Sequence, residues 1–250
     1  IVAVLLAATA VSMDFWNVRV EDVLVGQESS SYRVNGEIPV IPLESFSDEV
    51  ASAMEDVSQK MEEQDLYLNS SPGYWLRTFD RWADCEEFIG FPLNNPLEKS
   101  SLLETANYFA IAQDAETLNE ESQRHCAVAL QGNIKGELQH VTIDTGYLMG
   151  PIRIQMTVSL YPEGSGMEPG TGGSWNGEAE FEITSGVTGE GIPYTLVVSE
   201  TPESDYYNDF SSADAYFVLK NGLYPLDAVS PGRDSGADAK AALEELLALS

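Results

Sequence analysis

The sequence predicts an α+β fold, in which helices pack mainly on one face of an antiparallel sheet. Three observations support this prediction. Apolar residues recur at helical spacing at about 45–93, alternate with polar residues in short runs at about 103–227, and return to helical spacing at about 236–249. These regions are the expected N-terminal helical part, sheet and C-terminal helix of one domain, residues 14–250. No βαβ pattern indicates a doubly wound sheet.

The first expected helix follows an extended segment. Residues 14–45 mix short β-like runs with loops, and prolines at 39 and 42 keep the residues before them extended. Ser47 is a suitable N-cap for a helix that we expect to end near Gln64. Its apolar stripe comprises Val50, Met54, Val57 and Met61.

A second helix is expected over residues 79–89. Thr78 is its expected N-cap, Gly90 is a suitable C-terminal cap, and the proline at 92 prevents continuation. The residues that share one face of this helix are Phe79, Trp82, Cys85 and Ile89.

The sheet is predicted from runs of alternating or β-branched residues. Strands are expected at 126–134, 137–145, 152–160, 178–184, 193–199, 215–219 and 223–226. Residues 106–112 could form a strand or a helical segment, and a strand is preferred. Residues 162–177 are rich in Gly, Ser and Pro and are expected to form a loop. Asn221-Gly222 predicts a hairpin between the last two strands. Ser235 is the expected cap of the final helix, whose apolar face comprises Leu243, Leu246 and Leu247.

The charge of the chain excludes one class of function. Forty-one acidic residues against 12 basic residues give a formal net charge of -29. Such a surface repels phosphate backbones, so we expect no nucleic-acid partner. The acidity suits solubility outside the cell, the binding of cations or a basic partner, or a halophilic cytoplasm, and it does not choose among them.

The first 13 residues are apolar and contain no charged residue, Gly or Pro. A full membrane span needs about 20 apolar residues. We therefore expect residues 1–13 to be a truncated transmembrane or signal helix, with the aromatic pair Phe15-Trp16 at the membrane interface. A buried helix or strand of the domain is the alternative. The first interpretation predicts a single-pass cell-membrane protein with the bulk of the chain outside the cytoplasm.

The sequence indicates no catalytic residues, metal site or cofactor. It has no GxSxG, P-loop or Rossmann glycine pattern, and its two histidines lie outside any HExxH motif. His125 and His140 are expected at the surface or at a sheet edge. Glu180 and Glu182 share the outer face of one strand and are expected to face solvent. The acidic segment 203–209 lacks the spacing of a known calcium loop.

Aromatic residues and cysteines are the remaining candidates for a site. Trp175, Tyr206 and Tyr207 could line a platform for a sugar or a peptide, and packing over a sheet edge is the alternative for Trp175. Cys85 and Cys126 would be able to form a disulfide outside the cytoplasm. A buried free thiol also explains Cys85, because it shares a helical face with Trp82.

Three segments resemble a known group of proteins. Residues 78–93 (TFDRWADCEEFIGFPL), the apolar run before Asp14-Phe15-Trp16, and the closing FVLKNGLYPL with the LEELL helix are similar to uncharacterised extracytoplasmic domains of Gram-positive bacterial membrane proteins. Some of those proteins carry an anti-sigma-factor-like cytoplasmic region. The resemblance covers about a third of the chain and implies a role in signalling rather than catalysis.

The preferred hypothesis is therefore a non-catalytic extracytoplasmic sensor or interaction domain, held to the membrane by its N-terminal helix, with a protein or glycan partner outside the cell. One alternative is a carbohydrate-acting or carbohydrate-binding cell-surface protein that uses acidic and aromatic residues. Another is a structural envelope protein, which a large exposed apolar patch would favour.

Overall fold

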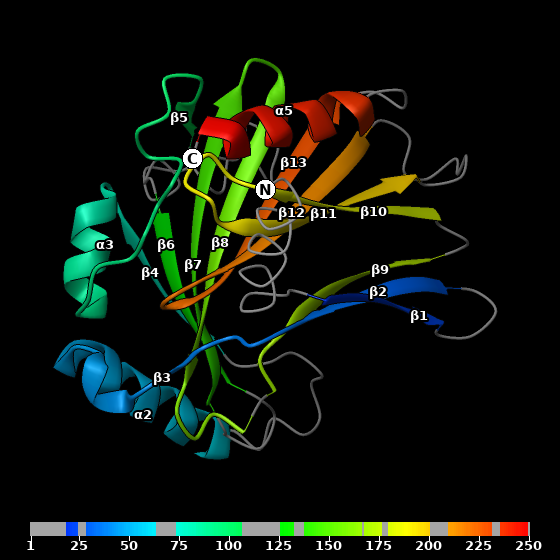
Figure 1. Cartoon of the computed structure of the whole chain (residues 1–250). Coiled ribbons are helices and arrows are strands. Elements are labelled where there is room, and N and C mark those ends of the chain that lie inside the picture. Colours follow the sequence, from blue (N-terminus) through cyan, green and yellow to red (C-terminus); the bar gives the residue numbers. More distant parts are fainter. Residues whose placement is uncertain are drawn as a thin grey trace, which may run out of the picture.

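The fold is α+β, as the sequence predicts, and its strands form two sheets (Figure 1). The computed structural model describes residues 19–24, 29–63, 74–106, 126–132, 138–166, 168–176, 180–200, 210–231 and 236–249. The predicted membrane or signal segment, residues 1–13, lies outside the described residues.

The main sheet has ten strands and is almost entirely antiparallel. Its central path runs through β10 (Glu180–Val187), β11 (Pro193–Glu200), β12 (Phe210–Leu219), β13 (Gly222–Pro231), β8 (Ile152–Pro162), β7 (Leu138–Met149), β6 (Cys126–Gly132) and β4 (Tyr74–Phe79). Two short strands lie off this path. β3 (Val40–Ile41) pairs in parallel with the end of β8, and β5 (Glu104–Ala106) pairs with β7.

A separate sheet of three strands packs against one end of the main sheet. Its strands, in spatial order, are β1 (Arg19–Leu24), β2 (Ser29–Asn35) and β9 (Thr171–Asn176). Tyr32 and Val34 of β2 form a buried cluster with Val197 of β11 and Tyr216 of β12. We call β1, β2 and β9 the small sheet.

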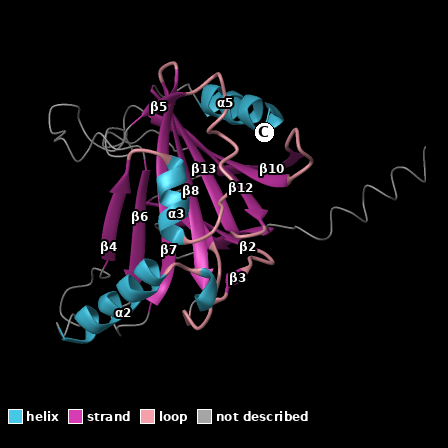
Figure 2. Cartoon of the chain, turned by 90° about the vertical axis from the view of Figure 1, so that its left-hand side faces the viewer, coloured by secondary structure: helices cyan, strands magenta, loops and turns pink. Residues whose placement is uncertain are grey.

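The described helices cover one face of the main sheet (Figure 2). α2 (Asp48–Glu63) and α3 (Trp82–Ile89) pack over β4 and β6, and α5 (Gly236–Leu249) packs over β11, β12 and β13. Alternation along each strand sends apolar residues toward these helices, as in β7, where Val141 and Ile143 are fully buried. We call this the helix face and the other side of the same strands the opposite face.

The start of α2 confirms the predicted N-cap. Ser47 Oγ accepts a hydrogen bond from the backbone N–H of Val50 at 3.2 Å and donates one to the carbonyl oxygen of Phe88 at 2.5 Å. The cap therefore also joins α2 to the end of α3. Val50, Met54 and Val57 are buried along the predicted stripe.

The predicted start of the second helix was wrong. Phe79 lies in strand β4, and α3 begins at Trp82 with Arg81 at the N-cap and no side-chain cap hydrogen bond. Pairing of β4 with β6 outweighs the local capping signal of Thr78. The expected helical part, 45–93, thus contains an edge strand of the sheet. The predicted end was right, because Gly90 adopts the left-handed conformation with φ of 104°.

The predicted loop at 162–177 was also wrong in part. Residues 171–176 form β9, which pairs with β2 and contains Trp175. A Cβ atom at Gly172 would lie 2.3 Å from the carbonyl oxygen of Tyr32. The absence of a side chain at this position lets β9 approach β2, so a glycine that suggested a loop serves strand pairing instead.

The hairpin and the apolar face of the final helix follow the prediction, and the predicted cap Ser235 lies outside the described residues. β12 and β13 form a hairpin in which Leu219 pairs with Gly222 around Lys220 and Asn221. α5 buries Leu243, Leu246 and Leu247 in the core. None of the described helices has both the length and the apolarity needed to cross a membrane.

Candidate functional site

A row of polar side chains crosses the opposite face of the main sheet. It comprises Asp144 on β7, Gln155 on β8, Asp227 on β13 and Asp214 on β12. Gln155 lies directly across from Asp227, and Asp227 lies directly across from Asp214. All four side chains are partly buried. We call these four residues the acidic row.

Asp214 and Asp227 form a carboxyl pair. Burial raises the pKa of both groups, and the neighbouring Asp214 charge raises the pKa of Asp227 further. The hydrogen bond between them lowers the pKa of Asp214 and raises that of Asp227. Asp227 is therefore the protonated carboxyl of the pair. Its hydroxyl donates a hydrogen bond to Asp214. Arg153 partly offsets this effect by lowering the pKa of Asp227.

Two tyrosines connect this carboxyl pair to the small sheet. The Tyr32 hydroxyl of β2 donates a hydrogen bond to Asp214 Oδ2 at 3.0 Å. The Tyr32 and Tyr216 hydroxyl oxygens lie 2.5 Å apart, and their rings meet edge to face. Burial raises the pKa of both phenols, so they stay neutral. Tyr32 also lines a pocket of about 350 Å³ together with Arg33 and Glu168.

Asp144 occupies the other end of the row. Its Oδ1 accepts a hydrogen bond from Thr157 Oγ1 at 2.6 Å, and its carboxyl also accepts one from the Gln155 side chain. Burial raises the pKa of Asp144 to about 6 even though both hydrogen bonds act to lower it. The site therefore contains a carboxyl that changes charge close to neutral pH.

Two polar atoms beside the row lack hydrogen-bond partners among the described residues. Thr142 precedes Asp144 by two positions on β7, is only 6% exposed, and has an unpartnered Oγ1. His140 precedes Thr142 by two positions, and its Nδ1 is likewise buried without a partner. Because alternate residues of a strand share a face, both extend the polar surface beyond Asp144. Such atoms favour a water molecule or a polar ligand.

The arrangement suits the binding of a positive group better than the binding of a metal ion. No cluster of three or more His, Cys, Asp or Glu side chains suited to a metal occurs within the described part of the chain. The row instead offers carboxyls, an amide and hydroxyls spread along a line across four strands. A ligand that bears ammonium or guanidinium groups can donate hydrogen bonds to several such acceptors.

The described residues do not test the aromatic platform that the sequence predicts. Trp175 belongs to β9, and its strand position is all that the structure describes of it. Tyr206 and Tyr207 lie outside the described residues. The structure does bring Cys85 and Cys126 together, both buried and both free thiols. Glu182 is mostly exposed, as expected, and pairs with Lys240 of α5 at 2.5 Å.

Two further sequence expectations concern the histidines. His140 was expected at the surface or an edge, but it lies on an inner strand, partly buried and stacked on Tyr161 with ring centroids 5.9 Å apart. Burial lowers its pKa. His125 lies outside the described residues.

The acidic row was missed at the sequence level. Asp is disfavoured in strands, so Asp144 within the run VTIDT and Asp214 within the run SADAY were signals of a special role. With 41 acidic residues in the chain, those signals did not stand out. No protein-family model, curated protein or solved structure matches this chain, so the site is interpreted from its own geometry.

Proposed function

We propose that this chain is a non-catalytic sensor or interaction domain outside the cytoplasm, anchored to a membrane through residues 1–13. We further propose that its acidic row binds a cationic segment of a protein partner. The observation that carries the proposal is the row itself, in which partly buried carboxyls from β7, β12 and β13 lie on one face of the sheet. The net charge of -29 adds long-range attraction for a basic partner.

The raised pKa values of these carboxyls should couple ligand binding to the release of protons. An ammonium or guanidinium group beside Asp144 or Asp227 would favour the charged forms of these carboxyls. Binding would therefore release protons. By linkage, the affinity would rise with pH through the range around 6 in which Asp144 titrates.

The hydrogen bond from Tyr32 offers a route from ligand binding to a structural response. A cation that attracts the Asp214 carboxylate competes with the Tyr32 hydroxyl for the same acceptor. Tyr32 belongs to the small sheet, which packs against the main sheet partly through this residue. We therefore expect the small sheet to change its packing or its hydrogen exchange when the row is occupied.

Calorimetry with a short oligolysine peptide tests the site. We expect binding to the full chain at pH 6 with proton release, measured as a difference in heat between two buffers of unequal ionisation enthalpy. Asp227→Asn keeps a donor for Asp214 but removes the titrating charge, so it should weaken binding about tenfold, equivalent to about 1.4 kcal/mol, and reduce the proton release.

The matched control is Glu190→Gln, which removes one charge from an exposed turn remote in sequence from the row. It should leave the affinity nearly unchanged. An equal loss in both variants would show that only net charge matters and would contradict a site at the row. Binding without proton release would also contradict a site at the acidic row.

A separate experiment tests the location. Alkaline phosphatase, which is active only outside the cytoplasm, can be fused to the C-terminus of the chain encoded by the full-length gene. We expect phosphatase activity in cells and none from a matching fusion of a cytoplasmic protein. An inactive but intact fusion would place the domain in the cytoplasm and overturn this part of the proposal.

A further inference from the structure

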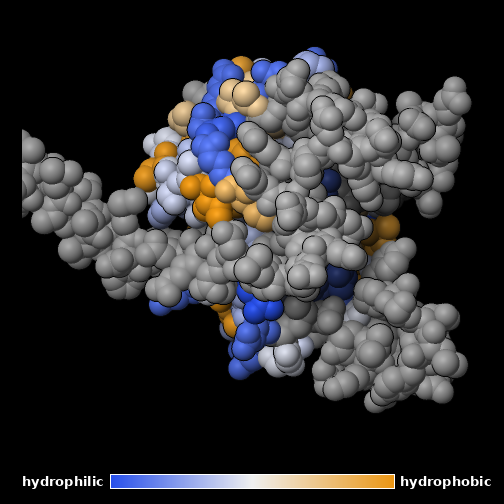
Figure 3. All heavy atoms as spheres, turned by 90° about the vertical axis from the view of Figure 1, so that its right-hand side faces the viewer, coloured by the Kyte–Doolittle hydropathy of each residue, from blue (hydrophilic) through white to orange (hydrophobic). Residues whose placement is uncertain are grey.

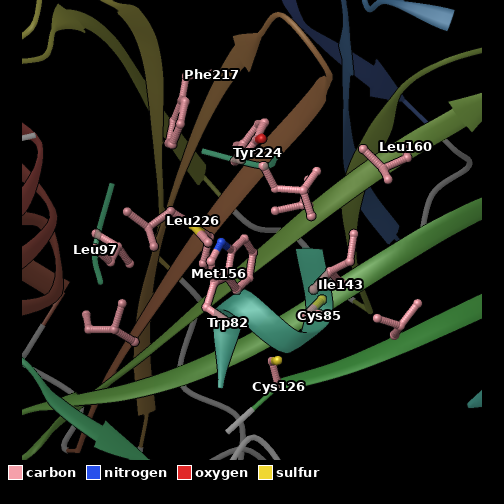
Figure 4. Packing of buried hydrophobic residues seen from close by; sticks show 14 of the residues in the cluster. Trp82, Cys85, Leu97, Cys126, Ile143, Met156, Leu160, Phe217, Tyr224 and Leu226 are labelled. Carbon is pink, nitrogen blue, oxygen red and sulfur yellow. The ribbon is translucent and has the colours of Figure 1, made fainter. Parts of the chain in front are cut away.

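Two cysteines from distant parts of the sequence meet in the core. Cys85 lies on α3 and Cys126 begins β6, and both side chains are at most 1% exposed. Figure 4 shows their sulfur atoms between the helix and the strand, pointing toward each other. A hydrogen bond with Cys126 and burial raise the pKa of the Cys85 thiol. Cys126 Sγ also lies 3.9 Å from the carbonyl oxygen of Arg81, to which it donates.

We propose that Cys85 and Cys126 form a structural disulfide, made while the chain folds in an oxidising compartment. Chance pairing explains this placement poorly, because the chain has only two cysteines and the fold brings both to one point. The inference does not rest on the cationic partner. It rests on the geometry of α3 against β6 and, for the oxidising compartment, on the proposed location outside the cytoplasm.

The bond requires a co-reactant, which is a small-molecule disulfide such as glutathione disulfide. One cysteine thiolate attacks a glutathione sulfur and releases a glutathione thiolate. The second cysteine thiolate then attacks the mixed disulfide, forms the Cys85–Cys126 bond and releases the second glutathione thiolate. The two cysteines lose two protons and two electrons, and the glutathione disulfide takes up both.

Burial sets when this reaction occurs. The thiolate is the reactive form, and the raised pKa of Cys85 keeps its thiol protonated in the folded protein. Glutathione also has no access to side chains with at most 1% exposure. Oxidation should therefore be fast during folding and slow once α3 has closed over β6. The finished bond should resist reductant for the same reason.

The disulfide would add a covalent link to the polar contacts that already hold this helix. At its C-terminal end, Ser47 binds the Phe88 carbonyl oxygen, and Glu86 accepts a hydrogen bond from the Leu93 N–H at 2.7 Å. A cross-link between residues about 40 positions apart restricts the unfolded chain strongly. It should raise the melting midpoint by about 10 °C relative to the reduced protein.

Refolding tests the proposal directly. The full chain is reduced and unfolded, then refolded in a glutathione redox buffer and, in parallel, in excess reductant. We expect the first sample to lose both titratable thiols under denaturing conditions, to lose the mass of two hydrogens, and to give a cross-linked peptide joining Cys85 and Cys126. The reduced folded sample should oxidise far more slowly on addition of glutathione disulfide.

Cys126→Ala serves as the control, since it retains Cys85 but has no partner for it. Its melting midpoint should be the same in redox buffer and in reductant. Should Cys126→Ala fail to fold, the wild-type comparison between the two buffers still decides. Two intact thiols after refolding in redox buffer, or a disulfide that leaves the midpoint unchanged, would overturn the proposal and assign the pair to core packing.

Discussion

The two faces of the main sheet use the same strands for different purposes. On the helix face, side chains such as Val128, Ile143, Met156 and Leu226 are fully buried against α2, α3 and α5. On the opposite face, the intervening positions of the same strands carry the acidic row. A face covered by helices needs only apolar residues of suitable volume. On a face that contains partly buried carboxyls, each carboxyl must form hydrogen bonds or take up a proton.

The outer surface of the described part mixes polar and apolar residues. On the side drawn in Figure 3, hydrophilic and hydrophobic patches of the described part adjoin one another. The exposed large apolar residues of the described chain include Ile183 and Val187 on the edge strand β10, at 38% and 48% exposure. Because these two side chains are largely in water, they contribute little to the stability of the fold. The helix face should therefore supply most of the apolar stabilisation, although smaller buried clusters such as Val197 with Tyr216 also lie on the opposite face, and the titrating carboxyls of the acidic row lie on the opposite face alone.

The largest expected effect comes from a matched pair of truncations, Ile143→Ala on the helix face and Ile183→Ala on β10. Ile143 is fully buried, so its truncation leaves a cavity and should lower the free energy of unfolding by about 3–4 kcal/mol. Ile183→Ala should cost below about 1 kcal/mol, because much of that side chain is already in water. Urea denaturation measures both, and equal losses would contradict the division between faces.

The helix face was largely predictable from sequence because its signals are local. Period-two alternation located most strands, and the spacing of Val50, Met54 and Val57 identified the buried stripe of α2. The errors in the predicted secondary structure arose where pairing between segments distant in the sequence decides whether a segment becomes a strand. Residues 74–79 become a strand because β6 lies beside them, and residues 171–176 become a strand because β2 does.

The second prediction concerns the pH dependence that Asp144 gives to the opposite face. The pKa of this carboxyl is about 6 in the folded protein and about 4 in the unfolded chain. Folding therefore takes up a proton, and the contribution of this group to stability falls as pH rises from about 4 to about 6. Asp144→Asn cannot titrate, so wild type should lose about 2–3 kcal/mol relative to this variant across that range.

Stability curves from urea denaturation at pH 4, 5, 6 and 7 provide the measurement. Glu190→Gln, which removes a charge from an exposed turn, should run parallel to wild type. Parallel curves for wild type and Asp144→Asn would mean that the carboxyl titrates normally in the folded state. That result would remove the main chemical distinction between the two faces.

The acidic row itself was beyond sequence analysis for a topological reason. Asp144, Gln155, Asp214 and Asp227 are neighbours only because β13 is inserted between β12 and β8. That strand order places a residue of the last hairpin beside one from the middle of the chain. Local patterns show which residues alternate, but they do not give the order of strands in a sheet.

The smallest expected effect tests the link from the opposite face to the small sheet. Tyr32→Phe removes the hydroxyl that donates to Asp214, which should cost about 1 kcal/mol of stability. The matched control is Tyr147→Phe on the helix face, which removes the acceptor for Asn95 Nδ2 at 2.8 Å and should cost a similar amount. Global stability alone therefore does not separate the two variants.

Hydrogen exchange followed by mass spectrometry does separate them. Tyr32→Phe should speed exchange in peptides from β2 and β9 and leave β6 and β7 protected, because the lost bond joins the small sheet to β12. Tyr147→Phe should leave β2 and β9 unchanged. Faster exchange of β2 in both variants would mean that the small sheet follows global stability. Faster exchange in Tyr32→Phe alone would identify the Tyr32–Asp214 hydrogen bond as the contact through which the acidic row holds that sheet.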